Sequence, residues 1–210
     1  HPGTTFAWGT AVDTFGLPNL YAYDAAAEQG GYVMGAMSQM LSAHQVIGVV
    51  GPLEVGDAKR YVTGFEAGAK AVVPTTTVLV DYTGSFGDIA LAAETATKDV
   101  GLGADVLTGT GEMVVGAISV AQANGALWFG TQASQSSLAP QNVVASQIYR
   151  WEVVLRPIVA DLDANVQQGR SLVADIANGG LVIEYNPGYT LAPEIKAKGG
   201  KAQAMAVDIA

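Results

Sequence analysis

Residues 46–130 alternate between short runs rich in β-branched side chains and longer segments whose apolar residues recur with helical spacing. This alternation is typical of parallel βα units, in which each buried strand is followed by a helix that covers one face of the sheet. Turn-forming residues such as Pro74 and Gly125 stand where the predicted helices end. The pattern predicts strands at 46–50, 77–82, 105–108 and 126–129, and helices at about 57–72, 88–99 and 112–124. We therefore expect a complete doubly wound α/β lobe in this region.

The flanking segments do not continue this regular alternation. Before the lobe, the sequence predicts a short strand near 5–8 and an apolar helix, rich in Gly, Ala and Met, at about 25–41. After Pro140 it predicts a strand at 143–151, an amphipathic helix at 152–168, a strand at 181–185 and a helical tail. One sheet would have to accept strands from both ends of the chain around an inserted lobe. The simplest arrangement is therefore two lobes.

The two-lobed arrangement divides the chain discontinuously. Residues 1–45 and 146–180 would form the remainder of the first lobe, and residues 46–145 and 181–210 the second. The chain would cross between them near residues 45, 130–145 and 180. Because the flanks supply too few strands for an independent doubly wound sheet, we expect one or more βα units of the first lobe to be absent from this sequence.

Charge and composition exclude several functions. Ten Lys and Arg residues stand against nineteen Asp and Glu residues, for a formal net charge of −9, whereas nucleic acid or an anionic membrane surface would require a basic face. The chain has no Cys and two His residues, so we expect no catalytic residue, metal site or cofactor. It has neither an initiator Met nor a signal peptide at its start, and no apolar run of membrane-spanning length. We expect membrane attachment only through an anchor outside this chain.

Candidate binding residues follow the predicted strands. In open parallel sheets, ligands bind beyond the carboxyl ends of the strands. The segments at these ends carry aromatic rings, amides, hydroxyls and some carboxylates. Aromatic faces combined with amides and hydroxyls suit a neutral ligand with a flat ring or a sugar. The aromatic and amide residues at these ends are Phe86, Trp151, Tyr185, Gln132, Gln135 and Asn186.

The turn Gly109–Glu112 joins a predicted strand to a predicted helix, as a dinucleotide-binding loop would. However, Val114 stands at the third glycine position of that motif, and Gln132 stands where an acidic residue would end the next strand. We favour a tight turn whose amides cap the helix or contact a neutral ligand. Asp88 is placed to cap the helix that follows it rather than to act in acid–base catalysis.

Seven segments resemble, in order, the basic membrane protein family. They are Gly30–Gly35, Val46–Gly51, Gly64–Ala69, Asp81–Asp88, Gly103–Val106, Leu138–Pro140 and Asn186–Pro187. The family consists of purine-nucleoside-receptor-like solute-binding proteins of ABC importers. The resemblance implies a periplasmic-binding-protein type I fold, with two doubly wound lobes, a ligand cleft at the hinge and commonly a lipid-anchored N-terminus. Residue 1 aligns well inside a family member, which agrees with the missing βα units.

The resemblance also implies site residues. Phe86 matches the family's Gly-Ser-Phe segment at the cleft, and Trp151 resembles an Asn-Trp segment that lies near the ligand in one branch. The family's Gly-x-Asp-x-Asp motif, whose carboxylates commonly bind ribose hydroxyls, aligns with residues 130–134, where Gln132 and Ser134 replace both acids. An amide can still bind a hydroxyl, without the gain in strength that a charge provides. The expected ligand contacts are Phe86, Gly111, Glu112, Gln132, Ser134 and Trp151.

These observations predict a solute-binding protein that acts outside the cytoplasm, in the periplasm or lipid-anchored at the cell surface. It would capture a nucleoside, a nucleobase or a sugar-like solute by hinge closure and deliver it to ABC permease subunits. The alternatives are the ligand-sensing domain of a transcription regulator, a sugar- or nucleotide-modifying enzyme, and a structural surface protein that reuses the fold. The scarcity of nucleophile and base candidates argues against the enzyme.

Overall fold

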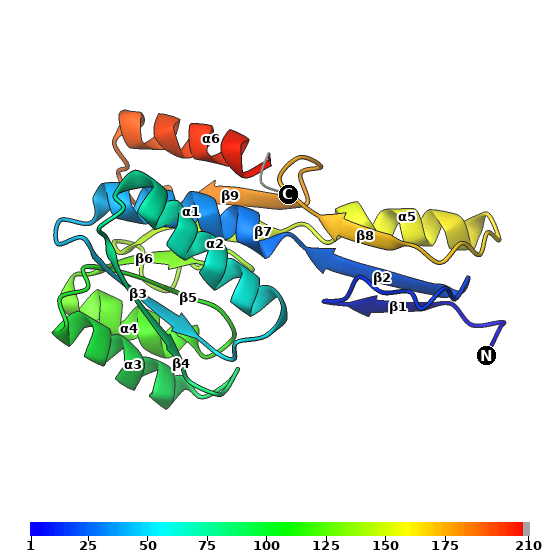
Figure 1. The fold of residues 1–210 in the computed structure, drawn as a ribbon, viewed down its shortest axis with the longest axis horizontal. Coiled ribbons are helices and arrows are strands. Elements are labelled where there is room, and N and C mark those ends of the chain that lie inside the picture. The colour runs from blue at the N-terminus through cyan, green and yellow to red at the C-terminus, as the bar shows by residue number, and fades with distance from the viewer. Residues whose placement is uncertain (208–210) are drawn as a thin grey trace.

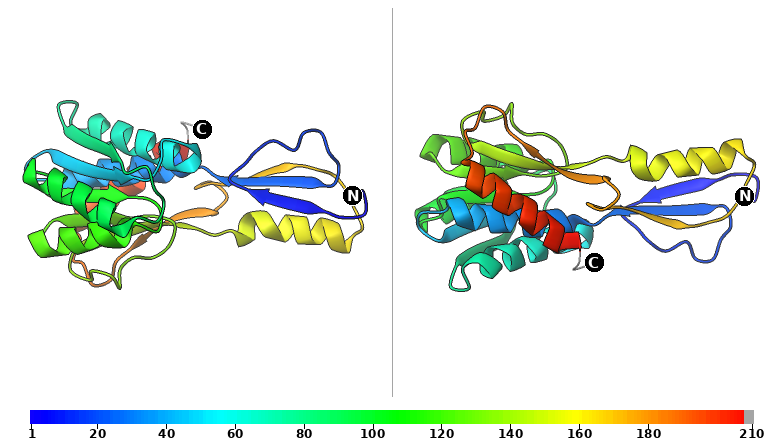
Figure 2. Two further views of the ribbon diagram at one scale, coloured as in Figure 1. Left: turned by 90° about the horizontal axis from the view of Figure 1, so that it is seen from below. Right: turned by 90° about the horizontal axis from the view of Figure 1, so that it is seen from above.

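Two separate sheets organise the chain, as the computed structural model of the protein shows (Figure 1). It describes residues 1–207, apart from the side chains of residue 194 and of residues 202–207. The larger sheet has six strands in the order β4-β3-β5-β6-β7-β9, and the smaller has three in the order β1-β2-β8. The result is an elongated molecule with a large lobe at one end and a small lobe at the other (Figures 1 and 2).

The large lobe is the doubly wound unit that the sequence predicts. Its strands are β3 (Val46–Gly51), β4 (Thr77–Tyr82), β5 (Val106–Gly109), β6 (Leu127–Gly130), β7 (Val143–Tyr149) and β9 (Leu181–Tyr185). All neighbouring strands are parallel except β7 and β9, which pair antiparallel. Helices α1 (Ala27–Leu41) and α2 (Gly56–Val72) lie on one side of the sheet, and α3 (Ile89–Gly101) and α4 (Val114–Asn124) lie on the other (Figure 1).

Each face of this sheet has its own apolar core. Ile47 and Val49 of β3 belong to the core beneath α1 and α2, whereas Val50 and Trp128 belong to the core beneath α3 and α4. This division follows from the sequence, because the central strands β3 and β6 carry only apolar residues, as strands covered on both faces do. The last helix, α6 (Pro193–Val207), packs outside α1, so that α1 is buried along most of its length.

Glycines set the distance between α1 and α2. Gly31 and Gly35 of α1 face backbone carbonyls of α2, and Gly64 and Gly68 of α2 face backbone carbonyls of α1. A Cβ atom at any of these four positions would collide with the opposite backbone. Glycine is a poor helix former, so these residues serve the close approach of the two helices rather than the stability of either one.

The small lobe has a helix on one face only. Its strands β1 (Phe6–Gly9), β2 (Leu20–Ala25) and β8 (Ser171–Ala174) are parallel, and α5 (Glu152–Asp163) covers one side. Tyr21 of β2 donates a hydrogen bond to Asp161 of α5 at 2.9 Å. Phe6 and Trp8 alternate with the strand residues that face α5 and remain 46% and 41% exposed. The second face of the small sheet therefore carries partly exposed apolar side chains, and Trp8 packs there against Phe15 of the loop that follows β1.

The chain crosses between the lobes at three places: from β2 into α1, from β7 into α5, and from β8 into β9 (Figure 2). The third crossing lies between Ala174, at the end of β8, and Leu181, at the start of β9. The first two differ from the predicted positions near 45 and 130–145. Helix α1, which the proposed division assigns to the first lobe, packs against α2 because of the glycine contacts, and all of β7 pairs within the large sheet.

Candidate functional site

The carboxyl ends of the parallel strands in both sheets meet at the junction of the lobes, whereas antiparallel β9 ends at Tyr185, on the opposite edge of the large sheet. Strand β7 ends at Tyr149 and passes directly into the small lobe at Trp151. Since β3, β4, β5 and β6 run parallel to β7, their carboxyl ends point the same way. Strand β2 of the small lobe ends at Ala25, and the chain then passes into α1 of the large lobe. We call the row of loops that follows these strands the interlobe edge; it is where open α/β sheets bind ligands.

Three of the predicted contacts lie together at the β4 and β5 end of the interlobe edge. The backbone carbonyl of Phe86 accepts a hydrogen bond from the Met113 N–H at 3.0 Å, which ties the two loops together. Gly111 lies in this turn with φ of +91°, and a Cβ there would lie 3.3 Å from the Phe86 carbonyl oxygen. Phe86 is 43% exposed and Glu112 is also exposed. The glycine thus permits a turn that leaves an aromatic ring and a carboxylate open to solvent.

Asp88, at the end of the same β4 loop, caps α3. Its carboxylate accepts a hydrogen bond from the Leu91 N–H at 3.0 Å. The sequence-based interpretation of Asp88 as a helix cap is confirmed.

Gln132 and Ser134 lie in the loop that follows β6, and both side chains are exposed. Gln132 adopts a left-handed backbone with φ of +69°, and its carbonyl accepts a hydrogen bond from the Tyr149 N–H at 3.4 Å. This bond holds the loop against the end of β7. By contrast, Gln135 turns inward, where its side-chain oxygen accepts a 2.7 Å hydrogen bond from the buried indole N–H of Trp128. Gln135 therefore supports the loop and is not a free amide.

Trp151 stands at the crossing from β7 to α5, between two tyrosines. Its ring centroid is 5.6 Å from that of Tyr23 in the small lobe and 5.2 Å from that of Tyr149 in the large lobe. Both contacts are edge-to-face, with interplanar angles of 70° and 65°. This geometry is favourable for aromatic pairs. Trp151 is half-buried, so it links the lobes and still presents part of its surface.

Tyr149 and Gln147 are polar residues at this crossing that the sequence-based site does not include. The Gln147 amide donates a hydrogen bond to the Tyr149 hydroxyl at 2.9 Å, and burial raises the pKa of that phenol. The side-chain oxygen of Gln147 is buried and has no hydrogen-bond partner among the described residues. Tyr149 had a sequence signal, because it stands at a strand end. Gln147, inside a strand, had none.

A second group that sequence reasoning missed is ionic. Arg60 of α2 lies 2.6 Å from a carboxylate oxygen of Asp24 and 3.2 Å from one of Glu28. Asp57, one turn before Arg60, is partly buried. Burial, followed by the negative charge of Asp24, raises the pKa of its carboxyl group. Because these residues are far apart in the sequence and each is unremarkable alone, no local pattern reveals them. Three carboxylates and one guanidinium therefore gather beside the aromatic crossing.

The interlobe edge thus combines aromatic surfaces with amides, hydroxyls and a few charges. Such a set can stack on a flat ring and bind its polar edge through hydrogen bonds. Among residues 1–207, no cluster of three or more His, Cys, Asp or Glu side chains is arranged to hold a metal ion.

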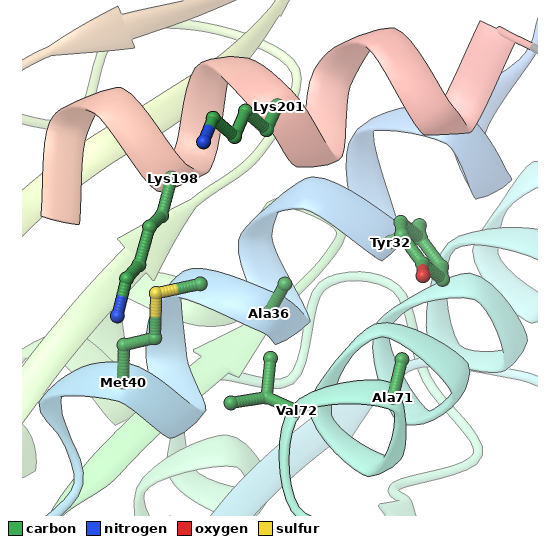
Figure 3. A pocket seen from close by; sticks show the side chains of 7 residues that line it. All are labelled: Tyr32, Ala36, Met40, Ala71, Val72, Lys198 and Lys201. Carbon is green, nitrogen blue, oxygen red and sulfur yellow. The ribbon is translucent and has the colours of Figure 1, made fainter.

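A different hollow lies between the helices of the large lobe. It is a groove of about 290 Å³ between α1, α2 and α6, with apolar side chains along its floor and two lysines on α6 (Figure 3). Its lining residues are Tyr32, Ala36, Met40, Ala71, Val72, Lys198 and Lys201. None of the predicted ligand contacts contributes to this groove.

The fold and this edge define a two-lobed α/β protein of the periplasmic-binding type I class. A solute-binding protein of an ABC transporter from Conexibacter woesei has the same fold, with a TM-score of 0.79 over 99% of this chain and 70% of that one, at 20% identity. A transcriptional activator from Bacillus halodurans matches with a TM-score of 0.81 over 96% of this chain and 69% of that one, at 18% identity. At these identities the likeness concerns the fold alone.

Sequence comparison identifies the family within this class. Residues 2–203 match the Bmp family, described as ABC transporter substrate-binding protein PnrA-like. The chain belongs to this family. It is 35% identical to basic membrane protein A of Borreliella afzelii over 61% of this chain and 40% of that protein. It is 27% identical to a purine-binding protein of Brucella abortus over 71% of this chain and 42% of that protein. The chain therefore spans less than half the length of these curated relatives.

Proposed function

We propose that this protein is the solute-binding component of an ABC importer and that it captures a purine nucleoside or nucleobase at the interlobe edge. The observation that carries the proposal is the family match, which extends over residues 2–203. The purine-binding relative from Brucella abortus supports the ligand class. Aromatic residues beside exposed amides and hydroxyls, at the carboxyl ends of the strands, provide the chemistry that such a ligand requires.

Each predicted contact has a role in this proposal. Phe86 and Trp151 stack on the flat ring, while the Gln132 amide and the Ser134 hydroxyl form hydrogen bonds with a ribose or with the edge of a base. Gly111 allows the ligand to approach the backbone at the β5 turn, and Glu112 accepts a hydrogen bond from a ligand N–H or O–H. Because Gln132 and Ser134 are uncharged, bonds to ribose hydroxyls lack the strength that a carboxylate adds.

The proposal includes location and partners. The protein acts outside the cytoplasm, in the periplasm or at the cell surface, where it transfers its ligand to permease subunits and performs no catalysis. A lipid anchor outside this chain would hold it at the membrane. Within residues 1–207, no helix combines the length and the apolarity needed to span a bilayer.

Isothermal titration calorimetry on the complete protein tests the ligand class. We expect adenosine, guanosine or the corresponding bases to bind with 1:1 stoichiometry, and Trp151→Ala to weaken binding by about tenfold or more, since stacking of a base on an aromatic ring contributes about 1–3 kcal/mol. Trp8→Ala is the matched control, because Trp8 lies on the face of the small sheet opposite to Tyr23, the small-lobe partner of Trp151. Equal affinities for Trp151→Ala and the parent would remove Trp151 from the site. The lack of binding of any purine would contradict the proposed function.

A second candidate is the ligand-sensing domain of a transcription regulator. The observation in its favour is the match to the activator from Bacillus halodurans, which shares the fold over 96% of this chain. Both candidates bind a small ligand, so calorimetry does not separate them. The complete gene product does: a DNA-binding domain joined to this chain would favour the regulator, whereas a lipidated N-terminus would favour the importer component.

A further inference from the structure

We propose that Arg60 is a positioning residue that sets the angle between the lobes through an ionic bridge, the interlobe latch, made of Arg60, Asp24 and Glu28. Asp24 is the penultimate residue of β2 in the small sheet, and Arg60 projects from α2 of the large lobe. Their 2.6 Å contact therefore joins the two lobes directly. It lies where the chain first crosses between them, from β2 into α1 (Figure 1).

The geometry of the latch restrains the crossing from several sides. One Asp24 oxygen accepts a hydrogen bond from the Ala25 N–H at 2.8 Å, and the other contacts Arg60. The Arg60 guanidinium also donates to the Ala25 carbonyl at 3.1 Å and contacts Glu28, in the first turn of α1, at 3.2 Å. A single planar group thus binds the end of β2, the crossing peptide and the start of α1. Rotation of one lobe against the other must break or lengthen these contacts.

Burial makes the latch stronger than an ordinary surface pair. The side chain of Asp24 is 7% exposed, so its charge is screened poorly by solvent and depends on Arg60 for compensation. The neighbouring Asp57 senses this charge, because burial and, after it, the negative charge of Asp24 raise the pKa of the Asp57 carboxyl group. Without Arg60, the carboxylates of Asp24 and Glu28 would lie at the crossing without their shared cation. Their repulsion would favour other lobe angles.

The latch rests on the proposed function in one respect only: it regulates the affinity of the site at the interlobe edge. A hinge held near one angle presents the two halves of the binding edge in a single arrangement. A hinge that samples many angles reduces the apparent affinity by the fraction of competent molecules. Loss of Arg60 is therefore expected to weaken binding although Arg60 is not one of the proposed ligand contacts.

Double electron–electron resonance, which measures the distance between two spin labels, tests the latch without any ligand. The chain has no cysteine, so Gln122→Cys on α4 and Ala160→Cys on α5 place one label on an exposed residue of each lobe of the complete protein. We expect one narrow distance distribution for the parent and a broader, shifted distribution for Arg60→Ala. Lys59→Ala is the matched control, because the adjacent Lys59 pairs only with Glu54 in the large lobe, at 3.2 Å, among the described residues. An Arg60→Ala distribution that coincides with the parent would overturn the proposal.

A double variant separates positioning from simple stability. Arg60→Ala alone leaves a buried Asp24 without its partner and should lower the unfolding temperature. Arg60→Ala combined with Asp24→Asn removes both charges and should recover much of that loss, while the distance distribution stays broad. A distribution that becomes narrow again in the double variant would show that carboxylate repulsion, and not the loss of the Arg60 contacts, broadened it, and would overturn the positioning role of Arg60.

The effect of the latch on ligand binding is measured by calorimetry, with guanosine and adenosine as probes. Arg60→Ala should bind about tenfold more weakly than the parent, a change that lies within the usual range of coupling between distant sites. Lys59→Ala should bind with the affinity of the parent. Unchanged affinity despite a broadened distribution would overturn the link between latch and site. If the parent binds neither probe, the proposed function fails, and the distance measurement still decides whether the latch exists.

Discussion

Asp99 on α3 provides the sharpest test of the energetics of this fold. Its side chain is fully buried, and neither carboxylate oxygen has a hydrogen-bond partner among the described residues. Burial, followed by the negative charge of Asp81, raises the pKa of Asp99 from its ordinary 3.8 to about 7. Lys98 offers little compensation, because its amine is bound to both oxygens of Asp81 at 2.6 and 2.7 Å. The protein therefore buries a carboxyl group that prefers to be protonated.

The sign of the pH dependence follows from this raised pKa. Between pH 4 and pH 7 the unfolded chain loses the Asp99 proton while the folded protein retains it, so the contribution of Asp99 to the free energy of unfolding falls as pH rises. A rise of the Asp99 pKa from 3.8 to about 7 corresponds to about 4 kcal/mol. Above pH 7 the carboxyl group is ionised in both states, and this destabilisation is present in full.

Asp99→Asn replaces the carboxyl group with a neutral amide of nearly the same shape. Urea denaturation should find the variant only about 1 kcal/mol more stable than the parent at pH 4.5, and up to about 4 kcal/mol more stable at pH 8. Asp163→Asn, which changes an exposed carboxyl group of α5, should show no such growth of the difference. Asp81→Asn should reduce the pH dependence of the parent, because it removes the charge that contributes to the raised pKa. A stability difference between Asp99→Asn and the parent that stays constant from pH 4.5 to pH 8 would refute this reasoning.

Three further predictions concern packing, capping and a buried hydrogen bond. Gly35→Ala should lower the free energy of unfolding by about 2 kcal/mol or more in chemical denaturation, because the added methyl group would meet the α2 backbone. Gly87→Ala is the control, since a Cβ at Gly87 would have no neighbouring atom within 4 Å, and it should change the free energy of unfolding by less than about 0.5 kcal/mol. Asp88→Ala should lose about 1 kcal/mol of stability and increase amide hydrogen exchange in the first turn of α3; unchanged exchange would argue against the cap. Tyr61→Phe should lose about 1 kcal/mol in thermal unfolding, since it removes the 2.7 Å bond between the Tyr61 and Thr108 hydroxyls; a neutral effect would mean that this bond contributes nothing net.

The large lobe was predictable because its information is local. Each strand from β3 to β6 is a short apolar run, and each helix between them repeats its apolar residues with a helical period. Burial of a parallel sheet on both faces requires these two patterns, so the alternation was sufficient to place the elements. Boundaries such as Gly56–Val72 for α2 differ from the prediction by only one residue at the start.

The lobe boundaries were harder because they depend on contacts between distant residues. Helix α1 is apolar on nearly all sides, and its pattern does not say which sheet covers it. Gly31 and Gly35 determine the answer only together with Gly64 and Gly68, through a backbone contact between two helices. A single sequence shows each glycine pair as a poor helix former and does not show that the two pairs face each other.

The candidate site likewise has residues that the sequence could predict and contacts that it could not. Strand ends are local features, so Phe86, Gln132 and Trp151 could be placed at one edge from the order of elements alone. The contact between Arg60 and Asp24 joins residues 36 positions apart from different lobes, and no spacing rule connects them. The contact of Trp151 with Tyr23 was likewise invisible, because Tyr23 comes from a segment of the small lobe far from residue 151 in the sequence.

The most direct test of the proposed function is native mass spectrometry of the complete protein as purified, followed by the same sample after denaturation. We predict an added mass equal to that of a purine base or nucleoside, either carried from the expression host or acquired when guanosine and adenosine are supplied, and lost on denaturation. A chain that carries no added mass and acquires none from any purine would contradict the central claim that this protein binds purines for import.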